Sequence, residues 1–485
     1  MAFIDSTIVN VALPALQKSL GGTVVDLQWV VEGYALFLSA LILVGGSLGD
    51  LLGRRRMFLA GVVVFAIASA CCGLAPNMYQ LVIARVIQGV GAAFLVPGSL
   101  SIISASFSEK ERGRAIGTWS GFTAITIAIG PVLGGWLIEH ASWRWAFFIN
   151  VPIAAAVIVL ALWRVPESKN VEPTTVDWTG ALLATVGLAG VTYGFVESSN
   201  LGWSQLPVWG SLVIGCASLV AFICVESRVK SPIVPLNLFR SPDFSGANLL
   251  TLFLYAALGI FFFLYPLNLI QVQHYSATAA GAAALPLILL MFLLSRWSGG
   301  LVARYGPKLP LIVGPIIAAV GFLLCAVPSI GGSYWRTFFP AFLVLGLGMA
   351  VSVAPLTTIV MSAVDQNRAG TASGINNAVA RVAGLLSVAT LGIVMVSAFS
   401  SRLDKSLSTM DISAEATREL RSNEIKLAAV SVPAGVDAST AAQITTAIDR
   451  SFVYGFRAVM LICVVLSLFG AVFAWRLIAR DVSSP

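Results

Sequence analysis

Charged residues are scarce in this chain. Of its 485 residues, 11% are Asp, Glu, Lys or Arg, and 58% are hydrophobic. A soluble globular domain has about 25% charged residues and about 45–50% apolar ones. A soluble chain of this length could not hide the excess in its core, because it would still need a wettable surface. The lack of charge therefore excludes a soluble globular protein and predicts an all-α, polytopic membrane protein.

The usual ingredients of catalysis and cofactor binding are also missing. The chain has two histidines, His140 and His274, and neither has a ligand partner nearby. None of its seven lysines follows a glycine, which excludes the Gly-Lys pair of an ATP-binding P-loop. Its six cysteines lack metal-ligand spacing, and its net charge of +7 includes no basic run with interleaved aromatics. We therefore expect no enzyme, no metal, no cofactor and no nucleic-acid partner.

Long apolar runs are what the chain has instead. A helix needs about 20 mostly apolar residues to cross a bilayer. The opening stretch 2–16 is a short candidate that spans about 22 Å. Thirteen further segments approach the full length: 27–48, 57–75, 79–105, 113–138, 145–163, 178–197, 207–225, 245–270, 277–302, 309–328, 335–363, 371–400 and 451–477.

Basic residues indicate the orientation of these helices. With the N-terminus in the cytoplasm, the inner segments hold sixteen Lys and Arg residues, whereas the short outer loops hold only Lys18, Arg144 and Arg336. This is the positive-inside bias of a multi-pass protein, so we expect both termini in the cytoplasm. The long polar segment 402–450 falls outside, either as an extracytoplasmic cap or as a loop.

An internal repeat divides the chain. GSLGDLLGRRR begins at Gly46 and GGLVARYGPKL at Gly299, which aligns Gly53 with Gly306 at an offset of 253 residues. Two six-helix halves around a central site are the architecture of many secondary transporters.

This architecture predicts three regions. A first six-helix bundle covers 1–165, two inserted helices cover 166–230, and a second six-helix bundle covers 231–485. The total is fourteen spans if the opening stretch counts as one.

The loop between the second and third helices combines a carboxylate, a turn and a cluster of cations. A carboxylate at a helix end and within reach of cations can form a breakable latch between two rigid bodies. The residues of this candidate gate are Gly46, Asp50, Gly53, Arg54 and Arg55.

A buried arginine is the next anomaly. Arg85 lies inside LVIARVIQGVGAA, with Gln88 one turn later. An arginine deep in a span costs about 2.5–3.5 kcal/mol even on lenient insertion scales, so it needs a polar partner or a water-filled cavity. A purely structural role, tying two helices together, is the alternative to a functional one.

Small residues crowd one helix. GFTAITIAIGPVLGG lets helix backbones approach closely, and its Gly-Pro step disturbs the hydrogen-bond ladder. The residues of this string are Gly121, Gly130, Pro131, Gly134 and Gly135.

Together these motifs resemble those of the major facilitator superfamily. DSTIVNVALP (Asp5–Pro14) and SWRWAFFINVP (Ser142–Pro152) are similar to signatures of its 14-helix drug:proton antiporters, the EmrB/QacA type. The resemblance covers nearly the whole chain. It implies the major facilitator fold, a cytoplasmic gate at the candidate gate loop and a role for Arg85 in proton coupling. It also implies that the protein is an antiporter, because the glycine-rich helix is similar to the motif of the antiporter branch.

Two embedded acids are candidates for the proton site. Asp5 and Glu32 lie within apolar runs. Burial disfavours an ionised carboxylate and a neighbouring arginine favours it, so such a group can exchange a proton as its surroundings change. Relatives place the residue matching Asp5 near the middle of a helix. Either the true start lies upstream of Met1, or the first helix begins inside the membrane, in which case Asp5 could be only a helix cap and Glu32 the better proton site.

The resulting hypothesis is a proton-coupled antiporter that exports lipophilic or cationic drugs across the cytoplasmic membrane, acting as a monomer. The alternatives are an exporter of an endogenous metabolite, lipid or siderophore, and, more remotely, a proton channel or sensor. Aromatic residues on the expected lining helices suit lipophilic cargo, although each taken alone is more simply explained by contact with lipid. They are Phe37, Trp119, Tyr255, Phe261 and Tyr265.

Overall fold

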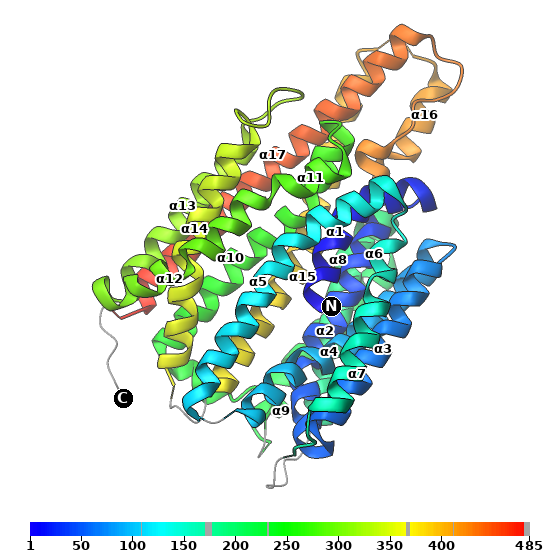
Figure 1. The fold of residues 1–485 in the computed structure, drawn as a ribbon. Helices are drawn as coiled ribbons and strands as arrows, with labels where there is room; N and C mark the ends of the chain where they lie inside the picture. Colours follow the sequence, from blue (N-terminus) through cyan, green and yellow to red (C-terminus); the bar gives the residue numbers. More distant parts are fainter. Residues whose placement is uncertain (108, 170–176, 230–231, 365–368, 411, 480–485) are drawn as a thin grey trace. The chain divides into compact units, whose positions relative to one another are not determined.

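A computed structural model describes the chain except for residues 108, 170–176, 230–231, 365–368, 411 and 480–485. The side chains of 104, 109–117, 120, 121, 124, 128, 296, 303, 369 and 370 also lie outside the description. Every regular element in the described residues is a helix (Figure 1). In chain order these are α1 (Ala2–Leu20), α2 (Val24–Leu52), α3 (Arg54–Leu74), α4 (Met78–Ser106), α5 (Glu109–His140), α6 (Trp145–Phe148), α7 (Asn150–Arg164), α8 (Trp178–Leu201), α9 (Leu206–Glu226), η1 (Leu236–Arg240), α10 (Pro242–Leu267), η2 (Asn268–Val272), α11 (Ala277–Ala283), α12 (Leu285–Tyr305), α13 (Lys308–Ala326), α14 (Phe338–Ser362), α15 (Ala369–Leu407), α16 (Ala414–Ser422), η4 (Glu424–Ala429) and α17 (Ala438–Leu477).

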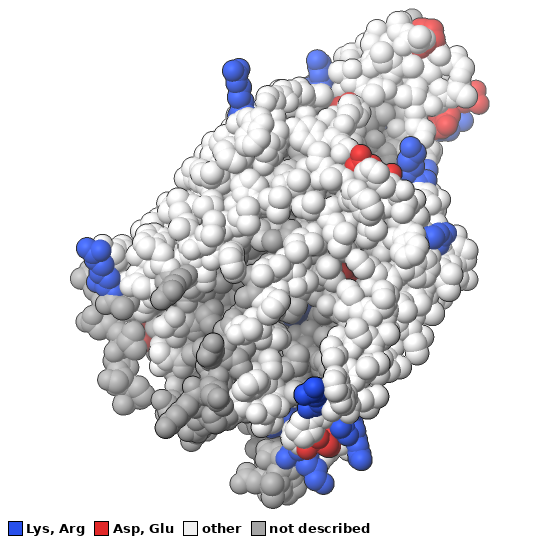
Figure 2. Space-filling view, viewed as in Figure 1, with Lys and Arg blue, Asp and Glu red and all other residues white. Residues whose placement is uncertain are grey.

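Twelve helical stretches in the described part of the chain are long and apolar enough to cross a bilayer. They coincide with twelve of the thirteen predicted full-length spans. The other, predicted at 113–138, lies within α5, which includes side chains that are not described. Figure 2 shows few charged side chains on the visible described surface away from the helix ends, as contact with lipid requires.

The first helix is longer than the sequence predicted. The stretch 2–16 was expected to span about 22 Å, but the 19 residues of α1 span about 28 Å. The helix continues because the residues after Ala15 are mostly good helix formers such as leucine, glutamine and lysine. It ends at Leu20, because the next residue, Gly21, has a φ of 68° that lies outside the helical region.

Residue contacts group the chain into two compact units. Unit 1 comprises Met1–Ala12, Trp29–Gly194 and Trp203–Asn237, and it contains α3 to α7 together with α9. Unit 2 comprises Leu13–Gln28, Phe195–Gly202 and Leu238–Pro485, and it contains α10 to α17. The domain boundaries near 165 and 230 stay a prediction.

The two glycines aligned by the repeat form similar turns. Gly53, with φ at 115°, is the only residue between α2 and α3. Gly306, with φ at 71°, ends α12 and is followed by Pro307 at the start of α13. Side chains other than hydrogen disfavour positive φ, so both turns favour glycine. Each unit therefore contains a tight helix–glycine–helix turn at the aligned position.

The segment 402–450 is mostly helical. α15 continues to Leu407, α17 begins at Ala438, and α16 and η4 lie between them in unit 2 (Figure 1). Leu420 and Leu427 are buried, and Gln17 donates a hydrogen bond of 3.1 Å to the Lys426 carbonyl. Of the two readings, a packed cap describes this segment better than a loop. Its extracytoplasmic location stays a prediction.

Candidate functional site

The candidate site is a buried polar cluster inside unit 1. α4 contributes Arg85 and Gln88, which share one helix face because they are three residues apart. α7 contributes Asn150 at its first residue, and α1 contributes Asp5. All four side chains are at most 1% exposed. Buried polar groups of this kind are stable only when they satisfy one another.

Asp5 is the acceptor at the centre of the cluster. Its Oδ2 accepts a hydrogen bond of 2.6 Å from Arg85 Nη1. Its Oδ1 accepts hydrogen bonds from Gln88 Nε2 at 2.8 Å and from Asn150 Nδ2 at 3.1 Å. Because these donors come from α4 and α7, the carboxylate links α1 to two other helices. Asp5 therefore does not act only as a helix cap, which was the alternative interpretation of the sequence.

The Arg85 guanidinium is held from several sides. Nη1 also donates to Gln88 Oε1 at 2.7 Å, and Nε donates to the Val30 carbonyl of α2 at 2.9 Å. The guanidinium carbon lies 4.3 Å from the centre of the Tyr34 ring, a cation–π distance. The polar partner that the sequence required for this arginine is Asp5.

The cluster continues through α3 to α6. Asn150 Nδ2 donates to Ser69 Oγ at 3.1 Å, and Ser69 donates to the Phe147 carbonyl at 2.8 Å. Asn150 belongs to the motif SWRWAFFINVP, but the sequence did not predict it, Ser69 or Tyr34 as site residues. An amide within an apolar motif was the available signal for Asn150, whereas serine and tyrosine are too common in membrane helices to stand out.

Glu32 has a different environment. It lies in α2 and is 1% exposed. Within the described part of the chain, its Oε2 has no hydrogen-bond partner. The two carboxylates predicted as proton sites are therefore both buried, but one is strongly paired and the other has an unsatisfied oxygen.

The candidate gate loop forms a cluster of its own in unit 1. Asp50 and Arg54 form an ion pair at 2.8 Å on either side of Gly53. Arg55 Nη1 donates to the Val165 carbonyl at 3.0 Å. Gly46 lies inside α2, and a Cβ added there would meet Pro97 Cβ at 3.7 Å, an ordinary packing distance.

Glu167 anchors this loop and was not predicted. Its carboxylate accepts hydrogen bonds from the backbone N–H groups of Arg55 at 3.0 Å and Arg56 at 3.2 Å. These groups belong to the first turn of α3, where free N–H groups and the helix dipole favour an anion. Glu167 thus joins the segment after α7 to the start of α3.

The glycine-rich string of α5 packs against α1. Gly130, Pro131, Gly134 and Gly135 are buried, whereas the surroundings of Gly121 lie outside the description. A Cβ at Gly130 would collide with the Thr7 hydroxyl, and one at Gly134 would lie 2.9 Å from Ile8 Cγ2. These α1 residues follow Asp5 by two and three positions, so the close approach helps to hold the helix that carries Asp5.

Two of the aromatic residues that the sequence suggested as lining a cavity lie instead in the packed interior of unit 2. Phe261 and Tyr265 are buried in unit 2, where their rings stack at 5.4 Å. The rings of Phe322 and Phe342 pack edge-on against Phe261 at 5.8 and 5.6 Å. These contacts make Phe261 and Tyr265 part of the core of unit 2.

The chemistry available at the buried cluster is proton binding and charge pairing. Asp5 can accept a proton, which would remove the charge that attracts Arg85. Among the described residues, no group of three or more His, Cys, Asp and Glu side chains could hold a metal ion. The cluster therefore links α1 to α4 and α7 through hydrogen bonds to one carboxylate.

Comparisons with known proteins agree on one family. The sequence profile of the Major Facilitator Superfamily matches residues 1–388. The Multidrug resistance protein Stp of Mycobacterium tuberculosis (strain CDC 1551 / Oshkosh) is 34% identical over 423 residues, which cover 84% of this chain and 76% of Stp. The Tetracenomycin C resistance and export protein of Streptomyces glaucescens is 34% identical over 404 residues, which cover 82% of this chain and 74% of that protein.

The fold has counterparts among solved structures. A bacterial homolog of the human lysosomal transporter Spinster, in an inward-facing and unoccupied conformation, matches with a TM-score of 0.67. The match covers 98% of this chain and 93% of that chain at 18% identity. This likeness shows a shared fold.

Proposed function

We propose that this chain, which belongs to the Major Facilitator Superfamily, exports small lipophilic or cationic drugs across the cytoplasmic membrane in exchange for protons. The predicted all-α membrane fold and the predicted family are confirmed. Relatives named for multidrug resistance and for tetracenomycin C resistance and export support drugs as the cargo, in preference to an endogenous metabolite.

The observation that carries the proton part of the proposal is the Asp5–Arg85 pair. Both side chains are buried, and the carboxylate receives hydrogen bonds from three side chains on two helices. A pair of charges in a low-dielectric interior interacts strongly, so adding a proton to Asp5 changes the free energy that holds α1 to α4. Protonation of Asp5 therefore changes how firmly α1 is held to α4.

The transport cycle follows from this coupling. Protonation of Asp5 weakens its link to Arg85 and favours one arrangement of the bundle, and deprotonation favours the other. Glu32, buried with an unsatisfied oxygen, supplies a second titratable group. The candidate gate loop, with its partly buried Asp50–Arg54 ion pair, acts as the cytoplasmic gate. The protein works as a monomer with both termini in the cytoplasm.

The test uses the full-length chain reconstituted into liposomes. A fluorescent lipophilic cation is driven against its gradient by an imposed pH difference, with and without a protonophore. Wild type should accumulate the dye only while the pH difference lasts. Asp5→Asn and Glu32→Gln should lose this accumulation, while at least one of them keeps dye exchange that requires no pH difference.

A matched control separates this effect from general loss of charge. Glu419 is an exposed carboxylate of α16, so Glu419→Gln should transport like wild type. Unchanged gradient-driven accumulation in both Asp5→Asn and Glu32→Gln would show that these residues do not couple protons. Dye movement that never saturates would point to a channel.

A further inference from the structure

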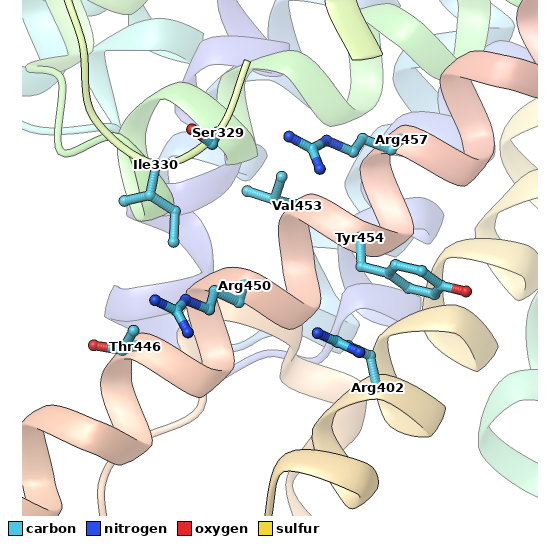
Figure 3. A pocket seen from close by; sticks show the side chains of 8 residues that line it. All are labelled: Ser329, Ile330, Arg402, Thr446, Arg450, Val453, Tyr454 and Arg457. Atoms are coloured by element: carbon cyan, nitrogen blue, oxygen red, sulfur yellow. The ribbon is translucent and has the colours of Figure 1, made fainter. Parts of the chain in front are cut away.

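A pocket in unit 2 gathers three arginines away from the Asp5 cluster. It has a volume of about 550 Å³ and lies between the last turns of α15, the N-terminal half of α17 and the loop after α13. Arg402 comes from α15, and Arg450 and Arg457 come from α17 (Figure 3). The rest of the lining includes Ile330 and Val453.

The positive charge of this pocket is not balanced by protein carboxylates. No acidic side chain lines it, and none of the three arginines forms an ion pair within the described part of the chain. The one described ion pair nearby in sequence joins Arg421 to Asp404 and leaves Arg402 out. Three like charges repel one another, so an anion in the pocket would reduce this repulsion, although water screens the exposed Arg402 and Arg450.

The arginines are partly pre-arranged for such an anion. Arg457 Nη2 donates to the carbonyls of Val327 at 3.0 Å and Pro328 at 3.1 Å, while its buried Nε has no partner in the described residues. The Arg402 guanidinium lies 5.8 Å from the centre of the Tyr454 ring. A buried donor without a partner is costly, and a bound acceptor would remove that cost.

The position of the pocket points to the polar surface of a bilayer. Arg450 immediately precedes the predicted apolar span 451–477, and Arg457 lies about two turns into it. A cation at the end of a span, such as Arg450, lies at the level of lipid headgroups, and the long side chain of Arg457 can extend toward that level. Tyr454 is half exposed beside them and, with Val453 and Ile330, offers apolar surface to the parts of a lipid next to its headgroup.

We propose that this pocket binds a phosphate-bearing anion, with Arg402 and Arg450 as its principal ligands. Guanidinium groups match the geometry of phosphate oxygens and can bind them in pairs. Basic pockets between transmembrane helices are suited to anionic headgroups. A phosphatidylglycerol-type headgroup and free phosphate share this chemistry, and in the predicted orientation the pocket faces the outer leaflet.

The experiment measures binding to the purified full-length chain in detergent by native mass spectrometry. The probes are phosphatidylglycerol, phosphatidylcholine as a lipid without net charge, and inorganic phosphate. Wild type should bind phosphatidylglycerol in preference to phosphatidylcholine, or bind inorganic phosphate. Arg402→Gln with Arg450→Gln should weaken the binding about tenfold or more.

The control is Arg336→Gln, which removes an exposed charge from the loop after α13 without touching the pocket. It should bind like wild type. Arg450→Gln alone removes an exposed side chain and should show an intermediate loss, which covers the case of a poorly folded double variant.

The two sources of the anion give different results. Phosphatidylglycerol binding that millimolar phosphate does not displace assigns the pocket to lipid. Phosphate binding with the same dependence on the arginines, and no preference between lipids, assigns it to the free anion. The proposal is overturned if wild type neither prefers phosphatidylglycerol to phosphatidylcholine nor binds inorganic phosphate. It is also overturned if Arg336→Gln lowers binding as much as the double variant does.

Discussion

Arg85 and Asp5, eighty positions apart in the chain, are joined by a hydrogen bond of 2.6 Å between two side chains with almost no exposed surface. Removing one member of a buried ion pair typically costs about 3–5 kcal/mol, because the other charge stays buried without compensation. Removing both charges costs less. This asymmetry distinguishes a true pair from two residues that act independently.

A double-mutant cycle tests the pair. Arg85→Gln should lower the free energy of unfolding more than the double variant Asp5→Asn with Arg85→Gln, because only the single variant strands a charge. The measurement is thermal or denaturant unfolding of the detergent-solubilised chain. Transport activity is not needed as a readout, since both variants alter the proposed proton site. Additive effects of the two substitutions would show that the residues do not interact.

Gly134→Val tests the close contact between α5 and α1. Valine would place atoms against Ile8, where a Cβ alone already comes within 2.9 Å. We expect a loss of about 1–3 kcal/mol in unfolding free energy, as for other overpacked sites. Gly210→Val in α9 is the matched control, because a Cβ there meets nothing within 4 Å. Equal effects of the two substitutions would mean that helix propensity, and not packing, limits position 134.

Glu424 in the packed cap makes stability depend on pH. Burial raises the pKa of its carboxyl above the ordinary value, the neighbouring Asp404 raises it further, and the Ser400 hydroxyl and Arg421 oppose the rise. A carboxyl with a raised pKa in the folded state stabilises the fold below its unfolded-state pKa, and this contribution is lost as the pH rises through the folded-state pKa.

Glu424→Gln should therefore gain stability relative to wild type at pH 7–8. The gain should shrink toward pH 4, where the wild-type carboxyl is protonated in both states. The measurement is the difference in Tm between the two proteins across this range. A difference that does not change with pH would contradict the raised pKa.

Much of this molecule could be predicted because a membrane makes polar residues conspicuous. The apolar runs predicted twelve spans that recur as described helices. Asp5, Glu32 and Arg85 stood out because charges are rare and costly within such runs. The aligned glycines at 53 and 306 also form corresponding turns.

The partners of these residues could not be predicted in the same way. That Asp5 binds Gln88 and Asn150, as well as Arg85, depends on how α1 packs against α4 and α7. Glu167 was not singled out from the sequence, because its role depends on the backbone N–H groups of Arg55 and Arg56 in another part of the chain. Composition identifies a helix that can span a membrane, but it does not determine which face of the helix is buried.

Cys72 is a native cysteine whose labelling can report on water at the Asp5–Arg85 cluster. Its sulfur lies 3.7 Å from Gln88 Oε1, at the edge of the Asp5–Arg85 cluster, and it is buried, while the adjacent Cys71 is exposed. A thiol must ionise to be alkylated, and ionisation requires water. The rate at which a small water-soluble reagent labels Cys72 therefore measures how often water enters the cluster, without any engineered label.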